Sequence, residues 1–191
     1  MIFVTSDFHF NHNKDFIYGK RGFENVDDMN QAIINAVNNT VGADDELYIL
    51  GDLMLGNLND GLNCMKQINC KNLYIVYGNH DTDTRKQAYW GLPQNIVEAG
   101  DALTRKYCGL HFYFSHYPTL TGNIQKESLS QMTLNIHGHT HQSNVFMDKD
   151  QFPFMFHAGV DSAPDFMPWS LDQIIYILAA NYKEIQAKEK Q

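Results

Sequence analysis

Three short apolar runs in the first half of the chain have the length and composition of buried β-strands. They are Ile2 to Thr5, Leu47 to Leu50 and Leu73 to Tyr77. No alternation of polar positions interrupts them, which is typical of strands that are covered on both faces. Helical patterns occupy the gaps between them. A strand–helix–strand order predicts parallel pairing through right-handed crossovers.

Two amphipathic helices are predicted between these strands. The first follows Asn25, which can cap it, and has Asp27 and Asp28 in its first turn, where acidic groups suit the helix dipole. Its apolar stripe consists of Met29, Ala32, Ile33, Ala36 and Val37. The second helix has a weaker stripe, interrupted by Gly61, that consists of Leu58, Leu62, Met65 and Ile68.

The second half of the chain contains shorter strand-like runs that lie close together in sequence. They are His111 to Ser115, Thr133 to Ile136, Asn144 to Met147 and Phe154 to Val160. This spacing predicts a second sheet with mixed or antiparallel pairing. A final helix begins at Ser170, where Gln173 can complete a capping box. Its polar tail, Lys183 to Gln191, is expected to fray.

Two stretches with little periodicity are expected to be loops at the rim of a site, Thr82 to Tyr107 and Tyr117 to Gln131. No repeat or Pro/Gly/Ser-rich linker divides the chain, so residues 1–191 are expected to form a single domain. With 191 residues, 43% of them hydrophobic, the chain can close a substantial core. The predicted fold class is α/β.

Charge and cysteine content narrow the class of protein. The formal net charge of -8 disfavours a protein that wraps a nucleic-acid backbone, because such binding requires clustered Lys and Arg. A phosphate substrate stays compatible, since bound divalent metals reverse the local field. Cys64, Cys70 and Cys108 fit neither a disulfide framework nor a zinc motif, so partly buried, reduced thiols are expected. With no leader pattern and no membrane-spanning run, a cytoplasmic protein without a membrane partner is expected.

Five of the apolar runs end in side chains that bind metals. The motifs are Ser6-Asp7-Phe8-His9, Gly51-Asp52, Gly78-Asn79-His80-Asp81, Ser115-His116 and His137-Gly138-His139-Thr140-His141. Ligands of open α/β sheets bind beyond the carboxyl ends of the strands, so these donors are expected to converge at one edge. Their glycines are expected to let the backbone approach closely. The carboxylate and imidazole set suits two divalent cations about 4 Å apart.

This ordered series resembles the calcineurin-like metallophosphoesterase superfamily, whose motifs are Asp-x-His, Gly-Asp, Gly-Asn-His, His and Gly-His-x-His. The resemblance runs from Asp7 to His141 and implies two β-sheets in a sandwich flanked by helices. It implies a first metal held by Asp7, His9, Asp52 and His141, and a second held by Asp52, Asn79, His116 and His139, with Asp52 bridging. It favours Mn²⁺, and Fe or Zn²⁺ also suits these donors.

A narrower resemblance, to small bacterial and phage phosphoesterases of uncertain substrate, rests on three segments. They are Thr5 to His12, Arg21-Gly22-Phe23 and Gly159-Val160-Asp161. Gly22 stands where that group usually has proline, and His157 also departs from its pattern, so the roles of Arg21 and His157 stay open. Protein serine/threonine phosphatases have an Asp and an Arg after their Gly-Asp, whereas Leu53 to Gly56 follows here, which disfavours that activity.

The constellation predicts hydrolysis of a phosphate ester. A water that bridges two divalent ions loses a proton near neutral pH and attacks phosphorus in line. His80, oriented by Asp81, is expected to stabilise the transition state or to protonate the leaving oxygen. Substrate contacts are assigned to His12 and Arg21, with a surface or capping histidine and an ordinary solvated charge as the alternatives. His111 and His137 are expected to be partly buried structural residues.

Three functional hypotheses follow. The first is a metal-dependent hydrolase of a small phosphodiester or phosphomonoester, with a nucleotide among the candidates. The second is a metal-dependent nuclease, against which the acidity and the lack of a basic stripe count. The third is a non-catalytic interaction module on the same fold, disfavoured because every proposed ligand is present. Substrate identity and oligomeric state are not indicated by these residues.

Overall fold

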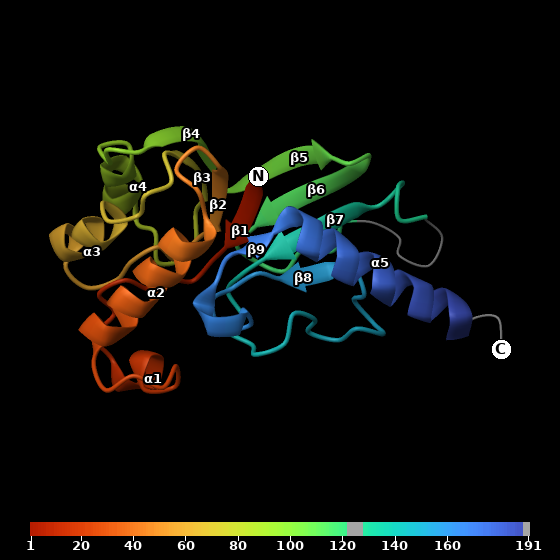
Figure 1. Cartoon of the computed structure of the whole chain (residues 1–191), viewed down its shortest axis with the longest axis horizontal. Coiled ribbons are helices and arrows are strands. Elements are labelled where there is room, and N and C mark those ends of the chain that lie inside the picture. The colour runs from red at the N-terminus through yellow and green to blue at the C-terminus, as the bar shows by residue number, and fades with distance from the viewer. Residues whose placement is uncertain (122–127, 189–191) are drawn as a thin grey trace.

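The computed structural model describes residues 1–121 and 128–188 and arranges them as two β-sheets with helices outside (Figure 1). In spatial order, the first sheet consists of β4 (Asn95–Gly100), β3 (Asn72–Val76), β2 (Glu46–Leu50), β1 (Ile2–Thr5) and β9 (Trp169–Ser170). The second consists of β5 (Ala102–Tyr107), β6 (Leu110–Ser115), β7 (Thr133–His137) and β8 (Met155–His157). The predicted α/β sandwich of two sheets flanked by helices is confirmed.

The parallel pairing predicted for the first three strands is confirmed, and β4 extends it. Strands β1 to β4 pair in parallel, while β9 runs antiparallel to β1. Helices α2 (Val26–Thr40), α3 (Leu58–Met65) and α4 (Asp83–Tyr89) lie between these strands along the chain. In the second sheet β5 is antiparallel to β6, whereas β6, β7 and β8 are parallel. The second sheet is therefore mixed, which is one of the two predicted arrangements.

The uninterrupted apolar runs are explained by two cores on opposite faces of the first sheet. In β2, Leu47 and Ile49 belong to the core under α2 and α3. Tyr48 and Leu50 point the other way, into the core between the sheets, which also takes in the apolar stripe of α5 (Leu171–Lys188). Because successive side chains of a strand point to opposite faces, a strand covered on both sides needs no polar positions.

The predicted helix starts are confirmed by their hydrogen bonds. The side chain of Asn25 accepts from the backbone N–H of Asp28 at 2.9 Å. At the start of α5, Gln173 N–H donates to Ser170 Oγ, while the Gln173 side chain accepts from the Ser170 backbone N–H. Helix α5 continues to Lys188, further than the expected start of fraying, and residues 189–191 lie outside the described part of the chain.

Several predictions of loops and strands were wrong. The stretch from Thr82 to Tyr107 contains α4, β4 and β5. Both strands lie at sheet edges and leave most side chains in contact with water, so their sequences lack apolar runs. The expected strand at Asn144 to Met147 is irregular, and the run from Phe154 to Val160 contracts to β8. In the expected loop from Tyr117 to Gln131, residues 122–127 lie outside the described residues, and the remainder has no helix or strand.

All three cysteines are free thiols. Cys64 and Cys70 are buried and burial raises the pKa of Cys64 to about 11, while Cys108 is exposed. Within the described ranges, no helix combines the length and apolar character that crossing a bilayer requires.

Candidate metal centre

The seven predicted metal ligands converge on turns that follow β1, β2, β3, β6 and β7. Five of the seven, Asp7, His9, Asp52, His139 and His141, have backbone φ angles between 48° and 71°. Residues other than glycine seldom adopt this left-handed conformation, and it persists where the surrounding structure enforces it. Such backbone strain is typical of functional sites. The turns therefore hold these side chains in positions that local sequence preference alone would not produce.

One group of donors is formed by Asp7, His9 and His141. The Nε2 atoms of the two histidines are 3.1 Å apart. His141 Nε2 also lies 3.9 Å from Asp7 Oδ1, and His9 Nε2 lies 3.6 Å from Asp52 Oδ2. The histidines are thus oriented toward each other and toward two buried carboxylates, which brings together the predicted ligands of the first metal.

A second group surrounds His116. Its Nε2 atom lies 2.9 Å from Asn79 Oδ1, 3.2 Å from His139 Nδ1 and 3.5 Å from Asp52 Oδ2. His139 Nδ1 is also 3.0 Å from Asn79 Oδ1. The predicted ligands of the second metal therefore lie together as well, with Asp52 Oδ2 between the two groups.

These separations fit ligand atoms that share a cation. Two atoms that each lie about 2.1 Å from a metal, at angles of 90° to 110°, are about 3.0 to 3.4 Å apart. Among residues 1–121 and 128–188, two triads have donor atoms within 4.8 Å of one another, Asp7-His9-His141 and Asp7-Asp52-His116. Asp7 belongs to both triads, a sharing that the sequence had assigned to Asp52. The mixture of carboxylates and imidazoles suits Mn²⁺, Fe or Zn²⁺.

Burial shifts the pKa values of Asp7 and His9, two members of the first group of donors. Burial raises the pKa of Asp7, because its carboxylate is withdrawn from water, and a cation would compensate that charge. Burial, with the neighbouring His141 and Arg21, lowers the pKa of His9 to about 2. His9 is therefore neutral across the physiological range, which is the state that binds metals.

Two glycines leave the space that these side chains occupy. A Cβ atom at Gly78 would collide with Asp52 Oδ1, and one at Gly138 would collide with Ser6 Oγ and Asp7 Oδ2. Glycine at these two positions therefore permits a close approach, as expected, and the groups that approach the backbone are side chains of candidate ligands and of Ser6.

Asp81 supports the turns around Asp52 from behind. It is buried, and its Oδ2 atom accepts from the backbone N–H groups of Asp52 at 2.9 Å and Gly78 at 2.7 Å. Its Oδ1 atom accepts from the Tyr89 hydroxyl. The hydrogen bonds of Asp81 in the described structure thus go to two backbone N–H groups and to Tyr89, and the orientation of the His80 ring by Asp81 stays a prediction. Tyr89 has no motif around it and was missed by the sequence analysis.

His80 lies at the open side of the centre. Its Nε2 atom is 3.9 Å from Asp52 Oδ2, its side chain is 41% exposed, and its ring centroid is 5.5 Å from that of His9. Its backbone N–H donates to Asp52 Oδ1 at 2.9 Å, while its carbonyl accepts from Arg85 at 3.0 Å. The backbone of His80 is thus held in place and its imidazole can reach a bound molecule.

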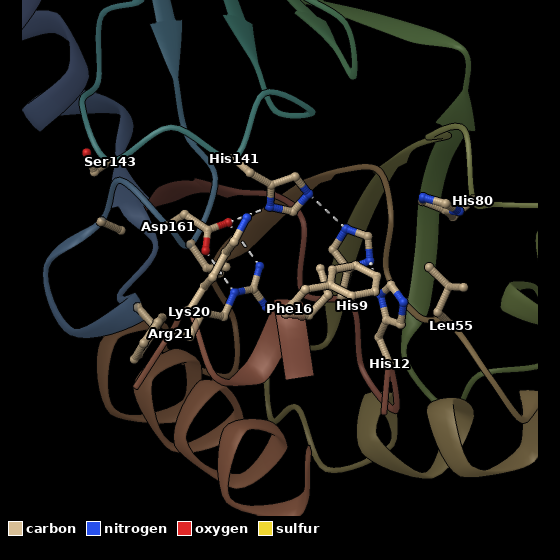
Figure 2. A pocket seen from close by; sticks show the side chains of 14 residues that line it. His9, His12, Phe16, Lys20, Arg21, Leu55, His80, His141, Ser143 and Asp161 are labelled. Atoms are coloured by element: carbon tan, nitrogen blue, oxygen red, sulfur yellow. Dashed lines mark hydrogen bonds and ion pairs between the residues drawn. The ribbon is translucent and has the colours of Figure 1, made fainter. Parts of the chain in front are cut away.

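Arg21 is part of a relay that ends at His141 (Figure 2). All five of its N–H groups are engaged: they donate to both Asp161 oxygens, to the carbonyls of Asp7 and Phe8, and to Met29 Sδ. The Oδ2 atom of Asp161, which accepts from Arg21 Nη2, also lies 2.7 Å from His141 Nδ1. The side chain of Arg21 is only 3% exposed. Its N–H groups are therefore bonded to the protein, although Arg21 also lines the pocket, and its contact with substrate phosphate stays a prediction.

Asp161 is ionised in this relay. Burial alone would raise its pKa, but hydrogen bonds from His141 and Arg21, and the Arg21 charge, hold the pKa well below its usual range. A carboxylate on the far nitrogen of a metal-binding histidine fixes the ring orientation and the tautomer. The sequence analysis names Asp161 only in a segment that resembles other phosphoesterases and assigns it no role. Its position directly after a short apolar run was the signal that could have identified it.

The remaining histidines differ in their surroundings. His12 Nδ1 lies 3.3 Å from His9 Nδ1, and the half-buried ring of His12 faces the pocket in Figure 2. His137 and His157 are both completely buried, with ring centroids 5.5 Å apart. His111 is exposed on β6, so the expectation that it is partly buried was wrong. His111 and Tyr113 alternate with buried residues in the first part of β6, so one face of the strand meets water there.

His157 is expected to make the metal-free protein sensitive to acid. Burial, with nearby His137, lowers the pKa of His157 to about 3, whereas an unfolded histidine titrates near 6.5. The stability that neutral His157 contributes is present above pH 6.5 and is lost as the pH falls toward 3, by about 1.4 kcal/mol per pH unit. In urea unfolding, His157→Leu should lose less stability between pH 6.5 and 4 than the wild type. His111→Gln, at an exposed position, should follow the wild type, and an unchanged slope for His157→Leu would contradict this explanation.

The fold and the cluster of donors define the class of the protein, a two-sheet α/β sandwich with a candidate site for divalent metals. The family profile described as a calcineurin-like phosphoesterase superfamily domain matches residues 1–159. The chain therefore belongs to the calcineurin-like phosphoesterase superfamily.

Similar proteins occur in an archaeon, a phage and a bacterium. The chain is 30% identical to the uncharacterized protein MJ1445 of Methanocaldococcus jannaschii over 93% of its own length and 90% of that protein. It is 26% identical to the gene 66 protein of Mycobacterium phage L5, covering 83% and 85% of the two chains. The crystal structure of the Aquifex aeolicus protein AQ665, of unknown function, has the same fold, with a TM-score of 0.68 and 23% identity over 93% of this chain and 98% of that one.

Proposed function

We propose that residues 1–191 act as a single metallophosphoesterase domain that binds two divalent cations and hydrolyses a small phosphodiester or phosphomonoester. Asp7, His9 and His141 would hold one cation, and Asn79, His116 and His139 the other, with Asp52 between them. Mn²⁺ is the proposed metal. When bound, two such ions supply an activated water and neutralise the charge that builds on the phosphate oxygens.

The protein's own side chains have distinct roles in this proposal. His80, with its accessible imidazole beside Asp52, donates a proton to the leaving oxygen or stabilises the charge on it. Asp81 holds the turns that carry Asp52 and Gly78 and does not touch the substrate. Arg21 and Asp161 orient His141. His12 faces the pocket beside the centre, where it contacts the ester.

The observation that carries the proposal is the convergence of seven donors on strained turns. Five of the seven occupy backbone conformations that the fold enforces, and ring nitrogens and side-chain oxygens of the seven lie 2.9 to 3.9 Å from one another. A cluster built only for stability would not need two imidazole rings whose Nε2 atoms face each other across 3.1 Å. Membership of a phosphoesterase superfamily supports the same reaction class.

A substrate panel tests the proposed reaction. Bis-p-nitrophenyl phosphate, p-nitrophenyl phosphate, linear and cyclic nucleotides and single-stranded DNA would each be incubated with and without Mn²⁺. Metal-dependent release from a small ester is the expected result, and the ratio of diester to monoester turnover then defines the preference. Cleavage of the DNA alone would identify a nuclease, and inertness toward every substrate after reconstitution with Mn²⁺, Fe²⁺ or Zn²⁺ would overturn the proposal.

Saturating Mn²⁺ is expected to raise the melting temperature. The native state brings Asp7 and Asp52 together in a buried site, so a cation that binds only this state stabilises it by mass action, by about 2.7 kcal/mol at 100 times its Kd. The measurement is differential scanning fluorimetry of metal-free protein with and without Mn²⁺. Asp7→Asn should reduce the shift, whereas Asp44→Asn, at a surface ion pair, should retain it. A wild type that does not respond to Mn²⁺, Fe²⁺ or Zn²⁺ would contradict the assignment of a metal site.

A further inference from the structure

A pocket of about 760 Å³ opens beside the candidate metal centre (Figure 2). His9, His80 and His141 form the side of the pocket that faces the centre. The volume lies within the range of about 300 to 1,000 Å³ that is typical of pockets for small organic ligands. A phosphate group bound at the candidate ligands would leave most of this space for the organic part of an ester.

The wall away from the metal ligands is largely apolar. It includes Ile17, Leu55, Val160 and Phe166, together with Phe16 from the short helix α1 (Asp15–Tyr18). Phe16 is 57% exposed, although large apolar side chains usually gain by burial. Its ring stands nearly perpendicular to that of His12, at 88° and 5.7 Å between centroids. An exposed aromatic ring at the mouth of a pocket offers a flat surface to a planar ligand.

The charged groups of the pocket are mostly engaged. Arg21 uses all five of its N–H groups within the protein, and Asp161 is bound by Arg21 and His141. Lys20 also lines the pocket, and it takes part in no ion pair among residues 1–121 and 128–188. The pocket therefore combines an apolar surface with one available cation, a poor fit for a second dianionic group and a good fit for an uncharged ring.

We propose that this pocket binds the planar aromatic group of a phosphate ester, with its phosphate at the candidate metal centre and its ring against Phe16. The proposal rests on the proposed function, because it takes the phosphate to be held by Asp7, Asp52 and the histidines. A nucleobase and a simple aryl group share this chemistry. Aromatic side chains stack on either kind of ring, and loss of such a stack commonly costs about tenfold or more in affinity.

Calorimetric titration of the Mn²⁺-loaded protein tests the pocket without requiring turnover. The ligands are inorganic phosphate, methyl phosphate, cyclohexyl phosphate, phenyl phosphate and adenosine 5′-monophosphate. Phenyl phosphate and the nucleotide are expected to bind at least about tenfold more tightly than methyl phosphate, while cyclohexyl phosphate, which has a similar size but is not planar, gains less. Tighter binding of the nucleotide than of phenyl phosphate would identify the group as a nucleobase, and the reverse order would identify it as a simple aryl group.

Variants at Phe16 connect the gain to this ring. Phe16→Ala should bring phenyl phosphate and the nucleotide down to the affinity of methyl phosphate, and Phe16→Trp should keep the gain. Trp90→Ala is the matched control, because Trp90 is also 57% exposed and lies outside the pocket, and it should bind like the wild type. If phosphate binds but methyl, cyclohexyl and phenyl phosphate bind equally, or if Phe16→Ala keeps the gain, the pocket proposal is overturned. If inorganic phosphate does not bind at all, the proposed function fails and this proposal fails with it.

Discussion

Asp52→Asn is expected to slow hydrolysis by a factor on the order of 10² to 10³, the scale on which loss of one preorganised electrostatic group slows an enzyme. The carboxylate Oδ2 lies 3.6 Å from His9 Nε2 and 3.5 Å from His116 Nε2, so its charge acts on both groups of donors. Asparagine has nearly the same shape and removes that charge. Its carbonyl oxygen can still accept from the His80 N–H, as Oδ1 does at 2.9 Å, so the turn should keep its conformation.

The measurement is the Mn²⁺-dependent kcat/KM of the wild type and the variant for the substrate that the panel identifies. Mn²⁺ affinity, measured by calorimetry, should fall in parallel. Asp44→Asn is the control, since Asp44 is 88% exposed and pairs only with Lys71 in the described structure. A variant that keeps both its turnover and its metal affinity would show that Asp52 does not lie between two metals.

Asp161→Asn is expected to weaken Mn²⁺ binding by about 10- to 100-fold, as loss of partners behind a metal ligand commonly does. Asp161 accepts from His141 Nδ1 at 2.7 Å and from Arg21 at 2.8 and 3.0 Å. An amide cannot accept from both neighbours, because its NH₂ group would face an N–H group of one of them. His141 would then lose the hydrogen bond that keeps Nε2 directed at Asp7.

Arg21→Gln should weaken metal binding through the same relay. If Arg21 acts through Asp161, the double variant should lose little more than either single variant, because the two residues form one connected unit. Calorimetric Mn²⁺ affinity of the four proteins measures this coupling independently of activity. An Arg21→Gln protein with unchanged metal affinity and a raised KM would instead restore the substrate contact that the sequence suggested.

The prediction of strands and helices was correct where burial on both faces gives an uninterrupted apolar run, or where a cap gives a recognisable local motif. Leu47 to Leu50 is apolar throughout because two cores enclose it, and Ser170 with Gln173 forms its capping box from residues three apart. The edge strands were not predicted, because they lack this burial on both faces. β4 has no fully buried residue, so its sequence resembles a loop.

For the site, residue types and their order along the chain were sufficient to identify the candidate donors. A carboxylate or imidazole directly after a buried strand is a local feature, and parallel strands deliver such ends to a common edge. The partners of those donors were not predictable in this way. Arg21 and Asp161 are 140 residues apart, and Asp81 is 29 residues from the Asp52 N–H that it accepts from.

Local sequence therefore specified which groups could bind metals, because that property belongs to each side chain and its neighbours. Folding alone paired Arg21 with Asp161, placed the Asp81 carboxylate against the backbone of Gly78, and opened a pocket between α1 and the turn that carries Asp161. Each of these outcomes depends on contacts between residues that are far apart in the sequence. Such contacts form only when the sheets and helices pack together.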